Sequence, residues 1–338
     1  YMYATEKITP RFVPLQVILS RYELNLAPGD AETVTVTILP EYAEDKTFTV
    51  TTSDKTIATA RIVNGAILVT GVKRGTCSVT VTTTNGVSAV INVKVVAVMK
   101  FITRIDNASR PIFFARMDED FTIDYGDGVD SREYTFDVAS TLYGWVIPTR
   151  ALTAGEEYTI TVKGSESASF QRSTGTVSTT LNTLREIIVV NGDRTTLSSF
   201  ATNATGLVKV HDGAFDDLPY VQNCTSLFNG CTSLNIVPGN LFAKLLNATD
   251  LSYAFYGCTS LTAVPDNFFR NLSAATNFGA AFYGCKSIQT VGRNVFSGCS
   301  SVTSFASLFY GCTSLVSVGY RVFAGCTAAE SFSYAFNG

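Results

Sequence analysis

Residues 255–261 read Phe-Tyr-Gly-Cys-Thr-Ser-Leu, and residues 309–315 repeat the same seven letters. Close variants begin at Phe228 and Phe282, so that four copies follow one another at intervals of 27 residues. Residues 336–338 open a fifth copy in the same register. A fixed period of this length indicates a repeat architecture, in which each unit buries its apolar side against its neighbours.

Each 27-residue unit contains two similar halves. A second series of phenylalanines lies about midway between copies of the first series, at Phe215, Phe242, Phe269, Phe296 and Phe323. After each first-series Cys comes an apolar pair with the spacing of Leu261 and Val264. An earlier, weakened copy keeps Leu207 and Val210 but has Ala in place of Phe and Cys, which is typical of a terminal cap. The pattern predicts a solenoid with an interior ladder at Phe228, Phe255, Phe282 and Phe309.

The cysteines occupy apolar positions of this pattern. Cys299 and Cys326 stand where other units have leucine, and Cys77 is in phase with neighbouring valines. Stacked coils would place Cys231, Cys258, Cys285 and Cys312 in a ladder at about 4.8 Å with parallel side chains. A disulfide requires Cβ atoms about 3.8 Å apart that point toward each other. We therefore expect buried free thiols that act as small core residues, with no metal-binding or nucleophilic role.

A row of tyrosines accompanies the phenylalanine ladder. Tyr256, Tyr283 and Tyr310 repeat at 27 residues, each between a predicted buried Phe and a Gly turn. They either form an exposed aromatic row suited to sugar rings or a protein surface, or only pack over the adjacent coil. Further members of the candidate binding face are Tyr253 and Tyr334, and the residues that would bound it are Asn229 and Asn337.

Residues 1–99 show the alternation of β-strands with one buried face. Val34, Val36 and Ile38 alternate with threonines, and the same period of two returns in several later runs. Asn-Gly pairs at residues 64–65 and 85–86 separate such runs, as in tight hairpins. These features predict a small β-sandwich.

Residues 100–181 contain a second set of alternating segments, including residues 121–125 and 158–162. Between them, residues 124–128 read Asp-Tyr-Gly-Asp-Gly. A calcium site could be built from the nearby carboxylates of Asp118, Glu119, Asp120, Asp124 and Asp127. A structural turn is the favoured interpretation, because Asp caps local amides and Gly tolerates positive φ.

Three family resemblances follow from these motifs. Residues 26–30 (Leu-Ala-Pro-Gly-Asp), 53–58 and 69–72 resemble the bacterial Ig-like domains of group 2, which serve as spacers or stalks on exported bacterial proteins. The Tyr-Gly-Asp-Gly turn at residues 125–128 resembles that of PKD-like β-sandwiches, with Tyr in place of Trp. The Phe-Tyr-Gly-Cys repeats resemble BspA-type leucine-rich repeats of Bacteroides-like surface proteins, although 27 residues exceed their commoner period. The last resemblance implies an adhesin or surface binding protein without catalytic residues.

Composition excludes several functions. The net charge of -3 leaves no basic excess for a phosphate backbone, so nucleic acid is not an expected partner. The single histidine, His211, falls at a predicted coil corner on the surface. Common catalytic and metal-binding motifs are absent, and no run of 18 apolar residues is present to span a bilayer. We expect no enzyme activity, no cofactor and no bound metal, although the sequence leaves paired carboxylates open.

These observations predict a mainly β protein with two β-sandwich domains followed by a leucine-rich-repeat solenoid. The expected domains are residues 1–99 (Ig-like), 100–181 (PKD-like) and 182–338 (BspA-like). The expected function is adhesion or ligand capture at the cell surface, through an outer-membrane lipid anchor or in the extracellular space, with a host or bacterial surface protein or a glycan as partner. A structural stalk component and a polysaccharide-binding accessory protein are the alternatives.

Both ends of the chain raise expectations of their own. Tyr1 in place of Met, without a basic and then apolar leader, suggests that any export signal has been removed. At Gly338 the register expects another Cys next, so the end is trimmed, further repeats follow, or the last coil is exposed and self-associates. The sequence leaves the ligand and the oligomeric state open.

Overall fold

A computed structural model describes residues 12–105, 113–116, 121–126, 132–134, 143–146, 152–164 and 182–338. The described residues form an all-β structure without α-helices. The chain divides into two compact units, residues 1–96 and 97–338. The boundary expected at residues 181 and 182 therefore falls inside the second unit.

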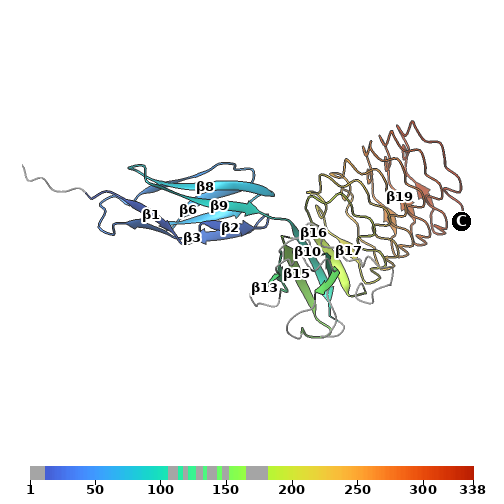
Figure 1. The fold of residues 1–338 in the computed structure, drawn as a ribbon. Coiled ribbons are helices and arrows are strands. Elements are labelled where there is room, and N and C mark those ends of the chain that lie inside the picture. The colour runs from blue at the N-terminus through green and yellow to red at the C-terminus, as the bar shows by residue number, and fades with distance from the viewer. Residues whose placement is uncertain are drawn as a thin grey trace, which may run out of the picture. The chain divides into compact units, whose positions relative to one another are not determined.

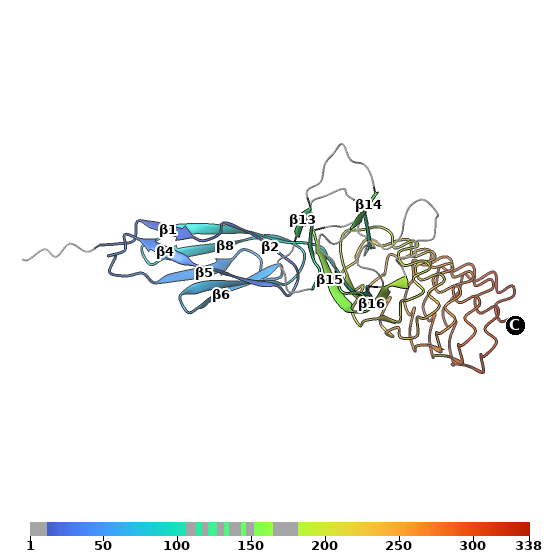
Figure 2. The same cartoon turned by 90° about the horizontal axis from the view of Figure 1, so that it is seen from below.

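The first unit is built from two sheets and a two-stranded ribbon (Figure 2). The larger sheet has the order β2 (Glu23–Leu26), β9 (Ser88–Val95), β8 (Gly75–Thr83), β5 (Phe48–Thr52). The smaller sheet has the order β3 (Ala31–Val34), β7 (Ala66–Gly71), β6 (Ala58–Val63). The ribbon pairs β1 (Gln16–Leu19) with β4 (Val36–Leu39).

The core of this unit lies between the two sheets, as the alternation predicted. Val79, Val81 and Ile91 of the larger sheet and Ile67 and Val69 of the smaller sheet are fully buried and belong to one apolar cluster. The predicted Asn-Gly hairpin joins β6 to β7, with φ of 49° and 77° at its two residues. Positive φ at both positions is the type I′ geometry that matches the twist of paired strands.

One alternating run is divided between two strands. The run from Val34 to Ile38 is interrupted at Thr35, so that β3 pairs with β7 whereas β4 pairs with β1. At the crossing, the N–H of Thr35 donates to Ser20 Oγ at 3.0 Å, and the N–H of Ser20 donates to Thr35 O at 3.1 Å. The alternation in the sequence did not reveal this break, because period two reports which side of a strand is buried but not a change of sheet.

The second unit begins with a six-stranded sheet. Its order is β13 (Arg132–Tyr134), β12 (Phe121–Asp124), β15 (Glu157–Lys163), β10 (Val98–Arg104), β16 (Leu184–Val190), β17 (Lys209–Val210). A separate ribbon pairs β11 (Phe113–Arg116) with β14 (Tyr143–Val146). Strand β16 is antiparallel to β10 and parallel to β17, so it connects the sheet to the repeats that follow.

The start of the turn after β12 is described as far as Gly126. The N–H of Gly126 donates to Asp124 Oδ1 at 2.8 Å, and Gly126 has φ +65°. A Cβ at Gly126 would lie 2.4 Å from Thr159 O, so this close approach of two backbones requires glycine. Of the candidate calcium ligands, Asp118, Glu119, Asp120 and Asp127 lie outside the described residues.

Residues 195–338 form a stack of coils, which we call the coil stack (Figure 1). Parallel bridges join residues 27 apart, at Thr196, Asn223, Asp250, Asn277, Ser304 and Ser331. On another side of the coils, β18 (Ala263–Val264), β19 (Thr290–Val291) and β20 (Ser317–Val318) form a parallel sheet. The 27-residue period of the sequence is therefore one turn of the stack.

Alternate residues of each coil bond in two directions. The N–H groups of Cys224, Ser226 and Phe228 donate to carbonyls of the next coil at 2.7–2.9 Å. Between them, the N–H groups of Leu227 and Asn229 donate three residues back within the same coil, both at 3.2 Å. This alternation satisfies the buried backbone without a continuous strand or helix.

Phenylalanines fill the interior of the stack. Phe255, Phe282 and Phe309 stack on one another with ring centroids 5.2 Å apart. In the second half-coil, Phe269 and Phe296 stack at 5.4 Å. All five rings are at most 2% exposed. The spacing follows the distance between coils, so each ring contacts its equivalent above and below.

The first coil is covered by the six-stranded sheet. Ile187 of β16 lies beside Val210 of β17 and is fully buried, and Leu184 takes the place of Leu207 in the same apolar spacing. The ladder therefore starts at β16. Here the spacing is 23 residues instead of 27, which is why the sequence period did not show it.

Candidate functional site

The predicted tyrosine row is a stack of rings. Tyr256 and Tyr283 lie 4.8 Å apart between centroids, Tyr283 and Tyr310 lie 4.7 Å apart, and both pairs are within 9° of parallel. We call these three residues the tyrosine stack. Each follows a buried Phe but is itself only half-buried, because its position lies at the Gly turn of the coil.

Stacking uses the faces of these rings. The two faces of Tyr283 are covered by Tyr256 and Tyr310, so that mainly its edge and hydroxyl remain available. Desolvation raises the pKa of the Tyr283 phenol, and repulsion from Tyr310 and Tyr256 raises it further. The rings therefore pack over the adjacent coils and also keep an exposed edge, and the use of that edge in binding stays a prediction.

Tyr253 and Tyr334 occupy a different position of the coil. Their side chains are 45% and 68% exposed, and both residues have positive φ, 58° and 57°. Tyr253 contacts Tyr256 at 5.9 Å with a tilt of 48°, so it joins the tyrosine stack from the side. Together with the tyrosine stack, these two residues form what we call the tyrosine face.

Short polar side chains beside the tyrosine face fix the backbone. Asp250 Oδ1 accepts from the N–H of Ser252, and Asn277 Oδ1 accepts from the N–H of Gly279, both at 2.8 Å. The hydroxyls of Thr249 and Thr276 each donate to a carbonyl of the preceding coil at 3.0 Å. The face is therefore presented by a bonded framework.

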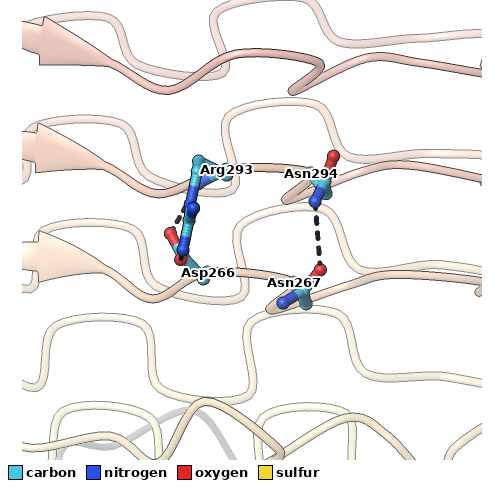
Figure 3. Close-up of polar contacts among 4 residues, drawn as sticks. All are labelled: Asp266, Asn267, Arg293 and Asn294. Atoms are coloured by element: carbon cyan, nitrogen blue, oxygen red, sulfur yellow. Dashed lines mark hydrogen bonds and ion pairs between the residues drawn. The ribbon is translucent and has the colours of Figure 1, made fainter.

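A second polar cluster, which the sequence reasoning missed, lies at another corner of the coils (Figure 3). Arg293 donates to Asp266 Oδ2 through Nε at 2.9 Å and Nη2 at 2.7 Å, and its N–H donates to Oδ1 at 2.7 Å. These bonds lower the pKa of Asp266. Asn294 donates to Asn267 at 3.4 Å beside this pair. Opposite charges 27 residues apart could have revealed it, and its groups neutralise each other.

The buried thiols donate hydrogen bonds across the coils. Cys258 Sγ donates to Phe228 O at 3.2 Å, and Cys285 Sγ donates to Phe255 O at 3.0 Å. Cys299 repeats the pattern toward Phe269 in the second half-coil, at 3.1 Å. The sequence predicted free thiols at core positions, and all eight cysteines are free in the structure. Their additional role as donors explains why Cys, rather than another small residue, suits these positions.

Burial makes these thiols weak acids. Desolvation raises the pKa of Cys224 and Cys299 to about 12 and that of Cys312 to about 11. Cys231, Cys258 and Cys285 shift in the same direction for the same reason. The thiolate is the nucleophilic and metal-binding form, so at neutral pH these groups are structural.

His211 is held at the junction between β16 and the first coil. Its Nε2 lies 2.5 Å from Glu186 Oε2, and its N–H donates to Ile187 O at 2.9 Å. The side chain is 31% exposed. The sequence placed His211 at a surface corner, whereas the structure places it beside a strand pair with a carboxylate partner.

Among the residues that the structure describes, no group of three or more His, Cys, Asp and Glu side chains is arranged to hold a metal ion. The same part of the chain contains no helix with the length and apolarity needed to cross a bilayer.

Comparison with known proteins identifies one part of the chain. Residues 15–93 match the family of bacterial Ig-like domains (group 2), which confirms the resemblance inferred for this segment. No curated protein matches the chain.

Among solved structures, the chain is similar to domains 4 and 5 of the S-layer protein SbsC, with 22% identity, a TM-score of 0.23, and coverage of 25% of this chain and 52% of that one. A longer SbsC structure, rSbsC(31-844), has 17% identity, a TM-score of 0.24, and coverage of 49% of this chain and 23% of that one. The chain thus spans about half of the first and about a quarter of the second.

Proposed function

We propose that this is a non-enzymatic ligand-binding protein of the bacterial cell surface. In this proposal the coil stack carries the binding face, and the Ig-like domain of residues 15–93 holds it away from the cell as a spacer. The family match supports a bacterial, surface-associated protein, because such domains commonly occur as stalk modules on exported proteins. The partner is a surface protein or a glycan.

The observation that carries the proposal is the tyrosine face. Five tyrosines gather on one side of the coil stack, and those of the tyrosine stack repeat in three successive coils. Tyrosine supplies a large contact area with few rotatable bonds, and its hydroxyl adds a hydrogen bond, so it is enriched where proteins bind ligands. A rigid backbone lowers the entropy that binding must overcome.

Several groups of the kinds that catalysis often uses are engaged within the fold. His211 is paired with Glu186, and the exposed Asp266 is paired with Arg293. The thiols of the coil stack are buried and protonated at neutral pH, as their raised pKa values show. These features favour binding over chemistry.

For the coil stack itself we propose membership of the BspA type of leucine-rich repeats. The support is the Phe-Tyr-Gly-Cys motif at the same position of three successive 27-residue coils, with a Phe-Asn-Gly-Cys variant at Phe228, and the Leu/Ile-x-x-Val spacing whose Val264 and Val291 lie in paired strands. The longer period is accommodated by two half-coils of similar backbone. The PKD-like resemblance of residues 100–181 stays a prediction.

The test is a screen of the purified chain against glycans and extracellular matrix proteins. The same screen is run on a variant in which each tyrosine of the tyrosine face is replaced by the residue that another coil has at the same position. The replacements are Tyr253→Ser, Tyr256→Asn, Tyr283→Asn, Tyr310→Asn and Tyr334→Ser. We expect a ligand that the chain captures and the variant does not, at an unchanged melting temperature. A ligand retained by the variant, or none at all, would contradict the proposal and favour a structural role.

Salt provides a second check. Beyond residue 200 the chain has six basic and six acidic residues, so bulk charge does not drive binding. Affinity should change little between low and high ionic strength, whereas a strong loss would show recognition through charge.

A further inference from the structure

One ladder of the coil stack holds its backbone in the left-handed region. Residues at 27-residue intervals all have φ between 54° and 58°, namely Ser199, Ser226, Tyr253, Ala280, Ser307 and Tyr334. Four of the six are Ser or Ala, whereas two are Tyr. Left-handed backbone is unfavourable for an L-residue and is rare for bulky side chains.

Burial in the core does not explain the two tyrosines. Tyr253 and Tyr334 are 45% and 68% exposed, so they add little to the core. Neither hydroxyl hydrogen-bonds to another described residue. Strained residues of this kind persist where the surrounding structure holds them, and they cluster at functional sites. The strain therefore directs attention to what these rings do on the surface.

Their neighbours leave room for a ligand. Tyr253 is flanked in the adjacent coils by Ser226 and Ala280, in contrast to Tyr283, whose neighbours are aromatic. Between Tyr253 and Tyr334 lie two coils with only Ala280 and Ser307 at this position. Three coil steps of about 4.8 Å separate the two tyrosines by about 14 Å.

We propose that Tyr253 and Tyr334 are two stacking platforms for a neutral glycan chain, which crosses the small residues between them and meets the exposed edges of the tyrosine stack. The inference rests on the proposed function and names its ligand class. The C–H face of a pyranose ring is weakly positive and packs on the negative face of an aromatic ring. Ring faces not covered by stacking are the ones available for this contact.

Charge around the platforms favours a neutral ligand. In the four coils that carry the tyrosine face, residues 249–256, 276–283, 303–310 and 330–337 contain no Lys or Arg, and their acidic residues are Asp250 and Glu330. The other polar groups are hydroxyls and amides, including Asn277 and Ser304. An anionic glycan would meet no cation within these segments, where Lys286 is the next basic residue after Tyr283, whereas a neutral glycan meets donors and acceptors.

Around Tyr253, the pattern of apolar exposure favours a glycan over a protein. Up to residue 315 of the coil stack, the exposed large apolar side chains beyond Tyr220 are scattered, namely Ile236, Leu246 and Tyr253. The last two coils, which carry Tyr334, also expose Val316, Val318, Tyr320, Phe332 and Phe336. A stable protein interface buries about 800 Å² on each partner around a continuous apolar core. Separate aromatic platforms with polar groups between them suit sugar rings better.

Native electrophoresis through gels that contain polysaccharide tests the inference on the full chain. The probes are a soluble α-glucan, a β-glucan, a mannan and a xylan, with heparin as the anionic comparison. The variant carries Tyr253→Ser and Tyr334→Ser, the residue of equivalent coils. Matched controls are Tyr220→Ser in the coil stack and Tyr42→Ser in the Ig-like unit, at tyrosines 55% and 66% exposed.

We expect at least one neutral polysaccharide to retard the chain and both controls, and the double variant to bind it at least tenfold more weakly. Retardation that the double variant retains would overturn the two platforms but leave the proposed function standing. Binding to heparin alone, or capture of a matrix protein without retardation by any neutral polysaccharide, would overturn the ligand class. Absence of any ligand in this assay and in the screen would overturn both proposals.

Discussion

The Ig-like unit and the coil stack form their buried cores from different side chains. The Ig-like unit buries β-branched and aliphatic residues such as Val69, Val81 and Ile91 between two sheets. The coil stack buries columns of phenylalanine, such as Phe255 and Phe282, inside coils made of turns. Side chains of neighbouring sheets interdigitate over a short distance, whereas one coil must fill its own interior. The size of the core side chains therefore follows from the space that each architecture has to fill.

The two regions should also differ in how far the effect of a destabilising substitution extends. In the sandwich, each strand contributes to one shared core, so that unfolding is expected to be cooperative. In the coil stack, each coil contacts mainly its two neighbours, and stability is close to a sum of nearest-neighbour terms. The four predictions below test this contrast, from the largest expected effect to the smallest.

Alkaline pH should produce the largest difference in stability between the coil stack and the Ig-like unit. Folding raises the pKa of the buried thiols above 9.0, so the folded state retains protons that the unfolded state loses. Their contribution is complete below pH 9 and is lost as the pH rises toward about 12. At pH 10 each fully buried thiol lowers the free energy of unfolding by about 1.4 kcal/mol. The loss is on the order of 5 kcal/mol for the four thiols Cys224, Cys231, Cys258 and Cys285 together.

Hydrogen exchange of the full chain at pH 7, 8.5 and 10, corrected for intrinsic rates, would measure this effect in each unit. The Ig-like unit is the internal control, because its one thiol, Cys77, is only half-buried. Equal loss of protection in both units at pH 10 would show that the buried thiols do not set the alkaline limit.

Removing one interior ring should be the next largest effect. Phe282 is fully buried and stacks at 5.2 Å on both Phe255 and Phe309. Phe282→Ala should destabilise the coil stack by about 3–5 kcal/mol, because it leaves a cavity that the flanking coils cannot close. Hydrogen exchange should accelerate in the neighbouring coils and stay unchanged in residues 12–96. The matched change Ile91→Ala should do the reverse, and a uniform response to either variant would refute the separation of the units.

A single thiol should matter less. Cys285→Ala removes the hydrogen bond to Phe255 O, and that carbonyl still accepts from the N–H of Cys258 at 3.1 Å. The expected loss is about 1–2 kcal/mol, the sum of a modest hydrogen bond and the lost packing of sulfur. Denaturant unfolding of the variant beside Cys77→Ala measures it. An unfolding free energy equal to that of the wild-type chain would mean that the hydrogen bond from the Cys285 thiol does not stabilise the coil stack.

The smallest effect should have the opposite sign. Tyr253→Asn replaces a bulky residue at φ 58° with one that tolerates the left-handed region. We expect stability to rise by about 0.5 kcal/mol while glycan binding falls, which is the trade between strain and function. Calorimetry of the variant beside Tyr220→Asn provides the measurement. A clear loss of stability would show that Tyr253 is there for packing.

Local periodicity predicted much of this architecture. The alternation at residues 79–81 and 91–95 located buried strand faces, and the Asn64-Gly65 pair located a type I′ hairpin, because both patterns are local. The 27-residue period predicted which phenylalanines and cysteines repeat inside the coils. These predictions depend only on which side chains recur, and recurrence is visible in the sequence.

Features that depend on long-range geometry were not visible. Strand β16 joins the repeat ladder at an irregular spacing, and the run at Val34 changes sheet at Thr35. The sequence grouped all the tyrosines together, whereas backbone geometry separates Tyr253 and Tyr334 from the tyrosine stack. The thiol donors depend on contacts across coils, which require knowing how the coils stack. The Asp266–Arg293 pair was different, because its separation by one 27-residue period was visible in the sequence but was not used.

The central claim is that the coil stack, and not the Ig-like unit, receives the ligand. Hydrogen exchange of the full chain, with and without the polysaccharide that retards it most, tests this claim most directly. We predict slowed exchange in peptides that cover residues 249–256, 276–283, 303–310 and 330–337, with no change in residues 15–93. Protection confined to residues 15–93 would contradict the account and make the Ig-like unit the receptor.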